Sequence, residues 1–347
     1  MTGTDHNTLQ IVLAPMEGVI DAPMRARLTS LGGYSRCVTE FIRVTDVLLP
    51  QRVFQRLCPE LAVGGCTPSG VPVYVQLLGS NPAVLAANAC RAANLGARGI
   101  DLNFGCPAKT VNKSQGGSIL LRRPEQVADI VRAVRDAVPA NIPVTAKIRL
   151  GYDNSNHLQE IVEGIRQAGV TQLAIHARTK YDGYKPPAHW STVSSAIHSC
   201  GENTLINGEI WSIADAVEAQ RASGCRHLML GRGALAAPDL ARRIQQAADS
   251  IAGAESPVAT GSVERRFAWL EILDLVEAQF HGSDCHSMRH VGNRTKQWLA
   301  YLKRNYPEAK ELFGRVRTLH DVAGIAAAFL QHRDSCVSRA SGSAIEQ

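Results

Sequence analysis

Polar residues stand near the ends of several short apolar segments, where buried strands would carry them into a common space. Gln76, Lys147 and His176 are the clearest cases. Amine and amide side chains are costly to bury inside apolar strands unless they have partners. Each one alone is explained equally well by a hydrogen-bonded residue in the wall of the fold. Three on successive segments favour a shared ligand.

Cys106 is the candidate for acid–base chemistry. It follows the apolar segment 99–105 in the run NFGCP, between Gly105 and Pro107. A thiol with an ordinary pKa of about 8.5 is mostly protonated near neutral pH, which suits an acid better than a nucleophile. On these features alone a buried structural cysteine is the commoner explanation, and we assign that role to five others: Cys37, Cys58, Cys90, Cys200 and Cys225.

Two glycine-containing runs indicate a phosphate site. They are Asn207-Gly208-Glu209 and Gly231-Arg232-Gly233. Glycine lets backbone N–H groups approach an anion, and arginine adds positive charge. Either run alone would be an ordinary turn, and neither a GxGxxG fingerprint nor a Walker A run occurs. With Lys147 nearby, the pair points to a phosphorylated cofactor of the FMN type.

The elements that must position these residues alternate between strand and helix patterns. Short runs rich in β-branched and apolar residues are separated by stretches of helical periodicity such as 82–95 and 124–138. Such alternation indicates parallel strands joined by right-handed crossovers. Eight units predict a (β/α)₈ TIM barrel with its active site at the C-terminal strand ends. The eight runs are 11–16, 37–41, 72–78, 99–105, 143–151, 173–178, 204–209 and 227–233.

Beyond the barrel the patterns change. We predict a catalytic barrel over 1–250, a linker over 251–262 that is rich in small residues with Gly and Pro, and a small all-helical C-terminal domain over 263–332. The last residues, 333–347, have little to bury and are expected to be disordered.

The positive charge of the chain is concentrated in this second part. The segment from Cys285 to Arg317 contains eight Lys and Arg residues and two acidic residues. Its net charge of +6 equals the net charge of the whole chain. A neutral barrel with a basic helical module suggests a polyanionic partner. No apolar run is long enough to span a bilayer, and the nine cysteines show neither zinc-site nor disulfide spacing. We therefore expect a cytoplasmic protein without metal or membrane partner, and a monomer.

At these residues the chain resembles the tRNA-dihydrouridine synthases, and among them the bacterial C-type. The resemblance runs from about Ile11 to Leu330 and preserves the order of its motifs. The motifs are LAPMEGV (13–19), TEFIRV (39–44), VQLLG (75–79), DLNFGCPAKTVNKSQGG (101–117), KIRLG (147–151), HARTKYDGY (176–184), NGEIW (207–211), LGRGAL (230–235) and RTKQWLAYLKRNYPEAKELF (294–313).

The resemblance implies roles for individual residues. Cys106 would be the proton donor, and Asn103 would position the target uracil. FMN would contact Pro15, Met16, Glu17, Gln76, Lys147, His176, Asn207, Gly208, Glu209, Gly231 and Arg232. The tRNA would contact Arg43, Asn103, Tyr184, Arg294 and Lys296.

The implied reaction is the reduction of uridine to 5,6-dihydrouridine in the D-loop of tRNA, at position 16 by likeness to the C-type. NADPH, or NADH, would be the reductant. A small-molecule FMN dehydrogenase of the dihydroorotate type would leave the basic helical module unexplained. An RNA-binding protein with a purely structural barrel would leave Gln76, Cys106, Lys147 and Arg232 unexplained.

Overall fold

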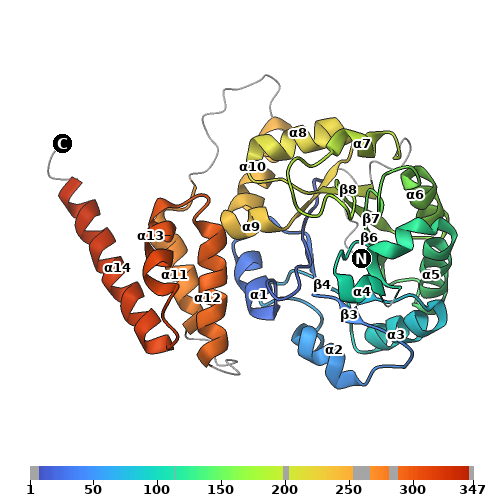
Figure 1. Cartoon of the computed structure of the whole chain (residues 1–347), viewed down its shortest axis with the longest axis horizontal. Helices are drawn as coiled ribbons and strands as arrows, with labels where there is room; N and C mark the ends of the chain where they lie inside the picture. The colour runs from blue at the N-terminus through green and yellow to red at the C-terminus, as the bar shows by residue number, and fades with distance from the viewer. Residues whose placement is uncertain (1–7, 114, 198–202, 253–265, 281–287, 344–347) are drawn as a thin grey trace.

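The computed structural model describes residues 8–113, 115–197, 203–252, 266–280 and 288–343. Within these ranges the chain folds into a barrel and a helical domain that lie side by side (Figure 1). None of the described helices is both long enough and apolar enough to cross a membrane.

The barrel is closed by eight parallel strands. They run in the order β2-β1-β9-β8-β7-β6-β5-β4, and β2 pairs with β4 to complete the ring. The short β3 (Ile42–Arg43) pairs only with the end of β4. The predicted TIM barrel is confirmed. The eight strands are β1 (Ile11–Leu13), β2 (Arg36–Val38), β4 (Val73–Leu78), β5 (Ile100–Asn103), β6 (Val144–Arg149), β7 (Gln172–His176), β8 (Thr204–Asn207) and β9 (His227–Leu230).

Helices surround the strands and cover their outer face. The strands' apolar side chains form one core with these helices, and a smaller cluster that includes Val12, Val38 and Met229 fills the barrel interior. The barrel helices are α1 (Ala22–Ser30), α2 (Gln51–Leu57), α3 (Pro82–Asn94), α4 (Lys109–Lys113), α5 (Pro124–Ala137), α6 (Leu158–Gln167), α7 (Trp190–Ser194), α8 (Ile213–Ser223), α9 (Arg232–Ala236) and α10 (Leu240–Ala252), with 3₁₀ turns η1 (Pro59–Val63) and η2 (Gly117–Arg122).

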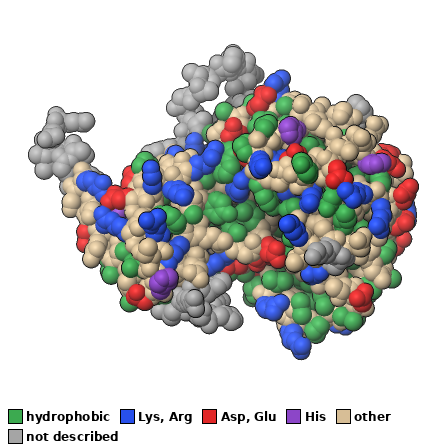
Figure 2. Space-filling view, viewed as in Figure 1, with side chains coloured by type: hydrophobic (Ala, Val, Ile, Leu, Met, Phe, Trp, Pro, Cys, Tyr) green, Lys and Arg blue, Asp and Glu red, His purple; other side chains and the backbone are tan. Residues whose placement is uncertain are grey.

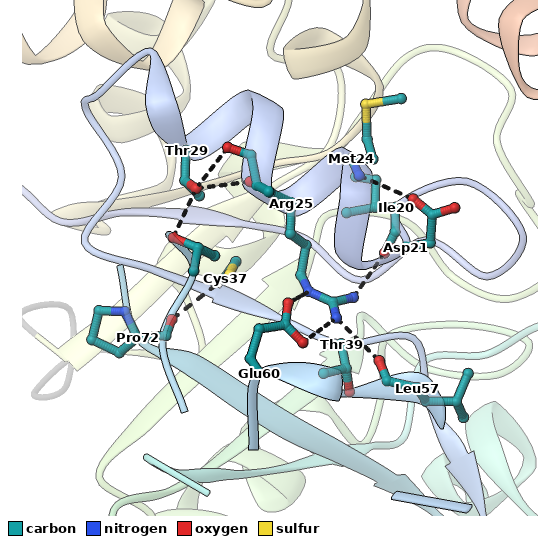
Figure 3. Close-up of polar contacts among 12 residues, drawn as sticks. Ile20, Asp21, Met24, Arg25, Thr29, Cys37, Thr39, Leu57, Glu60 and Pro72 are labelled. Carbon is teal, nitrogen blue, oxygen red and sulfur yellow. Dashed lines mark hydrogen bonds and ion pairs between the residues drawn. The ribbon is translucent and has the colours of Figure 1, made fainter. Parts of the chain in front are cut away.

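A buried ion pair fixes the first helix of the barrel. Arg25 of α1 is fully buried and donates to both carboxylate oxygens of Glu60 at 2.8 Å. Its remaining N–H groups reach the carbonyl oxygens of Ile20 and Leu57 (Figure 3). Breaking one side of such a pair leaves an uncompensated buried charge, which is strongly destabilising. The pair therefore holds in place the β1–α1 loop, which carries Pro15, Met16 and Glu17.

In the described residues the second domain is a bundle of four helices. Trp269 sits in its core against Tyr306 and donates to the Nε2 atom of buried His332 at 3.0 Å. The bundle docks on α9, because Trp298 donates to the carbonyl of Leu235 at 3.1 Å. The helices are α11 (Trp269–Glu277), α12 (Met288–Leu302), α13 (Pro307–Val316) and α14 (Val322–Ser343), with the 3₁₀ turn η4 (Ala278–Phe280) after α11.

The end of the chain differs from the sequence prediction. Helix α14 continues to Ser343, so residues 333–343 are helical where a disordered tail was expected. Arg333 pairs with Asp274 and Glu277 of α11, and Arg339 pairs with Glu311 of α13. Ion pairs attach this segment together with packing of Cys336 against the core, and the ion-pair partners are distant in the sequence. Most of the predicted linker, like residues 344–347, lies outside the described residues.

Candidate active site

A pocket of about 700 Å³ opens at the C-terminal ends of the barrel strands. The strand register explains its polar lining, because Asn103 lies opposite Lys147 on neighbouring strands and His176 lies opposite Asn207. The pocket brings together every residue predicted to contact a flavin, together with the predicted Asn103, Cys106 and Tyr184. Those flavin residues are Pro15, Met16, Glu17, Gln76, Lys147, His176, Asn207, Gly208, Glu209, Gly231 and Arg232.

One side of the pocket, formed by β4 to β6, contains a network of amide and hydroxyl groups around a buried acid. Gln76 donates to Asp101 at 2.7 Å, and Asn103 donates to the Gln76 oxygen at 2.8 Å. Thr145 donates to the other Asp101 oxygen at 2.5 Å. Burial is the largest influence on Asp101 and raises its pKa. These bonds fix the orientation of the Gln76 and Asn103 amides.

Asn103 also places the candidate acid. Its Oδ1 atom accepts from the backbone N–H groups of Gly105 and Cys106, each at 2.9 Å. The carbonyl of Cys106 accepts from the backbone N–H of Ser118 at 3.1 Å. Gly117, the residue before Ser118, has φ +67°. A Cβ atom on Gly117 would lie 2.8 Å from that carbonyl, so glycine permits the close approach. Burial, followed by the charge of Glu17, raises the pKa of the Cys106 thiol. The thiol is therefore protonated at neutral pH.

Two basic side chains in the middle of the pocket lose charge through burial. Burial and then the charge of Arg149 lower the pKa of Lys147 to about 7. Its amine lies 3.1 Å from the Oδ1 atom of Asn207. Burial and neighbouring cations also lower the pKa of His176 well below its usual value. Its Nε2 atom faces an Arg178 N–H at 3.3 Å, which suits a neutral imidazole that accepts there.

The opposite side, formed by β7 to β9, is built from charges. The Glu209 carboxylate lies 2.8 Å from the guanidinium groups of both Arg178 and Arg232, and it accepts from Trp211 at 3.2 Å. Burial acts to raise the Glu209 pKa, but these partners together lower it. Gly208 has φ +113°, and a Cβ atom there would lie 2.8 Å from the His176 ring. Glycine at this position therefore makes room for the His176 ring.

Three predicted tRNA contacts lie outside the pocket lining. Arg43 is exposed beside the loop that follows Cys106, with its guanidinium 3.4 Å from the carbonyl of Thr110. Arg294 bonds to the barrel, through Asp21 at 2.7 Å and the carbonyls of Gly18 and Val19. Lys296 donates to the carbonyl of Leu319. The last two cations therefore have partners within the protein. Figure 2 shows that Lys and Arg side chains spread over both domains on this face.

Comparison with known proteins identifies the family. Residues 12–329 match the family described as Dihydrouridine synthase (Dus). The chain belongs to the dihydrouridine synthases. A relative from Shewanella oneidensis named tRNA-dihydrouridine(16) synthase is 47% identical, and the match covers 89% of this chain and 93% of that one. Relatives of the same name from Vibrio parahaemolyticus (46%, covering 96% and 99%) and Pseudomonas putida (47%, covering 92% and 95%) are similar.

Solved structures at low identity share the fold of this dihydrouridine synthase. The structure of DHODH in complex with ferulenol from Eimeria tenella aligns with TM-score 0.53 at 13% identity, over 70% of this chain and 80% of that one. A histamine dehydrogenase from Rhizobium sp. 4-9 aligns with TM-score 0.51 at 15% identity, over 69% and 46%.

Several pocket residues of this dihydrouridine synthase were not among the predicted site residues. Arg149 lines the pocket, and fully buried Arg178 supports it through Glu209; both follow the pattern of alternating strand-end polar residues, which was a usable signal. Trp211 lies in the NGEIW motif, but nothing in the sequence indicates which way its ring points. Tyr301 comes from α12 and lines the pocket although it is remote from every barrel strand in the sequence.

Proposed function

We propose that the chain reduces uridine to 5,6-dihydrouridine in tRNA, at position 16 of the D-loop, with FMN as cofactor and NADPH (or NADH) as reductant. The observation that carries the proposal is a pocket with Cys106 at one side and, at the other, a carboxylate paired with two arginines that would accept an anion. Membership of the family and the names of relatives that match nearly the whole chain support the tRNA substrate. That substrate supports a cytoplasmic location, and a pocket completed within one chain supports a monomer.

The residues present fit a flavin mononucleotide. Gln76, Lys147 and neutral His176 would face the ring, where a positive or hydrogen-bond-donating group stabilises the negative charge of the reduced flavin. At the other end Arg232 and the backbone of Gly208 would hold the phosphate. The first strand's loop would close one side with Pro15, Met16 and Glu17. The remaining members of this end are Asn207, Glu209 and Gly231.

The protein's own part in the reaction is to orient the base and supply a proton. When bound, FMN supplies the hydride that adds to C6 of the uracil. Asn103, its amide fixed by Gln76, would position the uracil. Cys106 would give its thiol proton to C5, so that hydride and proton together saturate the C5=C6 bond, and water would then reprotonate the thiolate. Lys147, whose pKa of about 7 leaves it easily protonated, would stabilise negative charge near the ring.

A target base must leave its stack to reach this pocket, so the enzyme must hold a large folded RNA while it handles one nucleotide. Arg43 and Tyr184 are exposed near the opening and would contact the RNA there. Arg294 and Lys296 are proposed contacts in the helical domain, in addition to their bonds within the protein.

The test is to map dihydrouridine in tRNA from cells with and without the gene. We expect loss of dihydrouridine at position 16 alone and its return when the gene is restored. The purified protein should reduce the same position in unmodified tRNA only when NADPH, or NADH, and FMN are present. Unchanged position 16 in the deletion strain, with no activity of the pure protein on tRNA, would reject the proposal and favour a small-molecule substrate.

A further inference from the structure

Cationic and aromatic side chains alternate in one continuous series across the pocket opening. The guanidinium carbon of Arg149 lies 5.1 Å from the Tyr184 ring centroid, and that of Arg232 lies 5.5 Å from the same ring. Arg232 is also 5.2 Å from the Trp211 ring, and Arg304 lies 4.0 Å from that ring. The first four residues belong to the barrel, whereas Arg304 follows α12 of the helical domain. The series therefore links the two domains.

Trp211 connects this series to the proposed phosphate site. Its ring contacts the guanidinium groups of both Arg232 and Arg304, and its Nε1 atom donates to Glu209 at 3.2 Å. Glu209 has φ +57°, a left-handed conformation that is uncommon for a residue with a side chain. Such a conformation persists where surrounding contacts hold it. The indole is one of three groups that hold the Glu209 carboxylate, together with Arg178 and Arg232.

The helical domain braces the same segment from a second direction. Helix α9 begins with Arg232, and the carbonyls of Leu235 and Ala236 near its end accept from Trp298 at 3.1 Å and Asn305 at 2.9 Å. Tyr301, three residues after Trp298, lines the pocket itself. The segment that carries the phosphate-site arginine is thus fastened at its C-terminal end by residues of the helical domain.

We infer that Arg304 and Trp211 are positioning residues for the Glu209–Arg232 pair, so that the helical domain helps to retain the flavin nucleotide. The inference rests on the proposed function, because it assigns the flavin phosphate to Arg232. It gives the basic helical domain a role in cofactor binding in addition to RNA binding. Without the Arg304 guanidinium the indole is free to turn, and Glu209 then loses one of its three partners.

The experiment compares two adjacent cations of the helical domain. Arg304→Met keeps the aliphatic stem and removes the charge that lies over Trp211. Lys303→Met is the matched control, because Lys303 is also exposed and its ammonium lies 4.9 Å from the ring of Phe313 within the same domain. The full-length apo-proteins are titrated with FMN, and binding is followed by flavin fluorescence. We expect Arg304→Met to raise the Kd for FMN about two- to fivefold, as the loss of one cation–π contact implies, and Lys303→Met to leave it unchanged.

Two further variants test the route through the indole. Trp211→Phe keeps a ring but removes the N–H that Glu209 accepts, and it should weaken FMN binding even if Arg304→Met does not fold. Arg304→Lys restores a cation and should recover part of the loss.

Each outcome decides the inference. An FMN Kd unchanged in both Arg304→Met and Trp211→Phe overturns it, and so does an equal rise in Arg304→Met and Lys303→Met, which would show a general charge effect. If the unsubstituted apo-protein does not bind FMN, the proposed function itself fails. Loss of tRNA affinity in Arg304→Met with an unchanged FMN Kd assigns Arg304 to the RNA alone.

Discussion

The two sides of the pocket differ in the side chains that line them and in the groups they could bind. On the β4–β6 side, amides surround one buried acid, and Cys106 follows with a raised pKa. On the β7–β9 side, a carboxylate lies between two arginines, one of them fully buried. Hydrogen bonds from the Gln76 and Asn103 amides can orient a bound molecule without requiring that it be charged, which suits a flat ring and a uracil. A cluster with one cation in excess suits a phosphate.

The difference has a simple physical consequence. Burial and the Glu17 charge outweigh the nearby Arg149 and Arg43 and keep the Cys106 thiol protonated, whereas the same thiol beside the Arg178–Arg232 pair would be drawn toward thiolate. The fold therefore separates the acid from the anion site by placing them on opposite strands of one ring. Perturbing each side should give distinct losses.

The largest effect is expected on the β4–β6 side. Cys106→Ala should bind FMN and oxidise NADPH normally but lose about 10²–10⁴-fold in uridine reduction, because a positioned acid contributes that much. Single-turnover reduction of tRNA by the pre-reduced enzyme measures it. Cys90→Ala removes a half-buried thiol on α3, away from the pocket, and is the control. Near-normal dihydrouridine formation by Cys106→Ala would contradict the assignment.

The next effect belongs to the charged side. Arg232→Met should weaken FMN binding about tenfold or more, because a hydrogen bond to a charged group is lost. Riboflavin, which lacks the phosphate, should bind equally well to both proteins. Arg221→Met, on the exposed face of α8, removes a surface arginine as the control. An FMN affinity that survives the Arg232 change would place the phosphate elsewhere.

Lys147, between the two sides, should make binding depend on pH. Its pKa is lowered to about 7, first by burial and then by the Arg149 charge. A bound flavin ring that accepts a hydrogen bond from Lys147 favours the protonated form of its amine. Above pH 7, where the free amine is mostly neutral, flavin binding therefore takes up a proton. Riboflavin affinity should be highest below pH 7 and fall above it by up to about tenfold per pH unit.

Riboflavin is the probe here because a phosphate monoester itself titrates near pH 6. Lys147→Met should bind it with a flat pH profile. A slope that persists in this variant would assign the proton to another group.

The smallest effect is expected from the helical domain, whose two predicted tRNA contacts already have partners. Arg294→Ala combined with Lys296→Ala should weaken tRNA binding and reduce the slope of log K against log salt by up to about two, one per phosphate contact. Asp21→Asn is the matched control, since it breaks the Arg294 pair but keeps both cations. Suppose that Asp21→Asn loses as much tRNA affinity as the double variant, and that the double variant keeps the full slope of log K against log salt. The role of the two cations would then be to hold the helical domain in place, without contacting tRNA phosphates.

Local sequence determined the barrel and most of its site. Alternation of apolar strands and helices specified eight units, and in such a barrel all strand ends meet at one face. Gln76, Lys147, His176 and Arg232 could therefore be predicted from their positions at strand ends. Cys106 could be placed on that face, but its role as an acid came from family resemblance. The bounds of the helical patterns followed from periodicity in the same way.

Tertiary structure alone decided how the two domains meet and which groups are paired. Tyr301 enters the pocket and Arg304 stacks on Trp211 only because the bundle docks on α9. The helix over 333–343 is attached by ion pairs with residues far away in the chain and by packing of Cys336 against the core. No local pattern encodes such contacts, because they depend on the relative placement of two separately patterned domains. Tertiary structure also lowers the pKa of Lys147 and raises that of Cys106, since both shifts come first from burial in the assembled barrel.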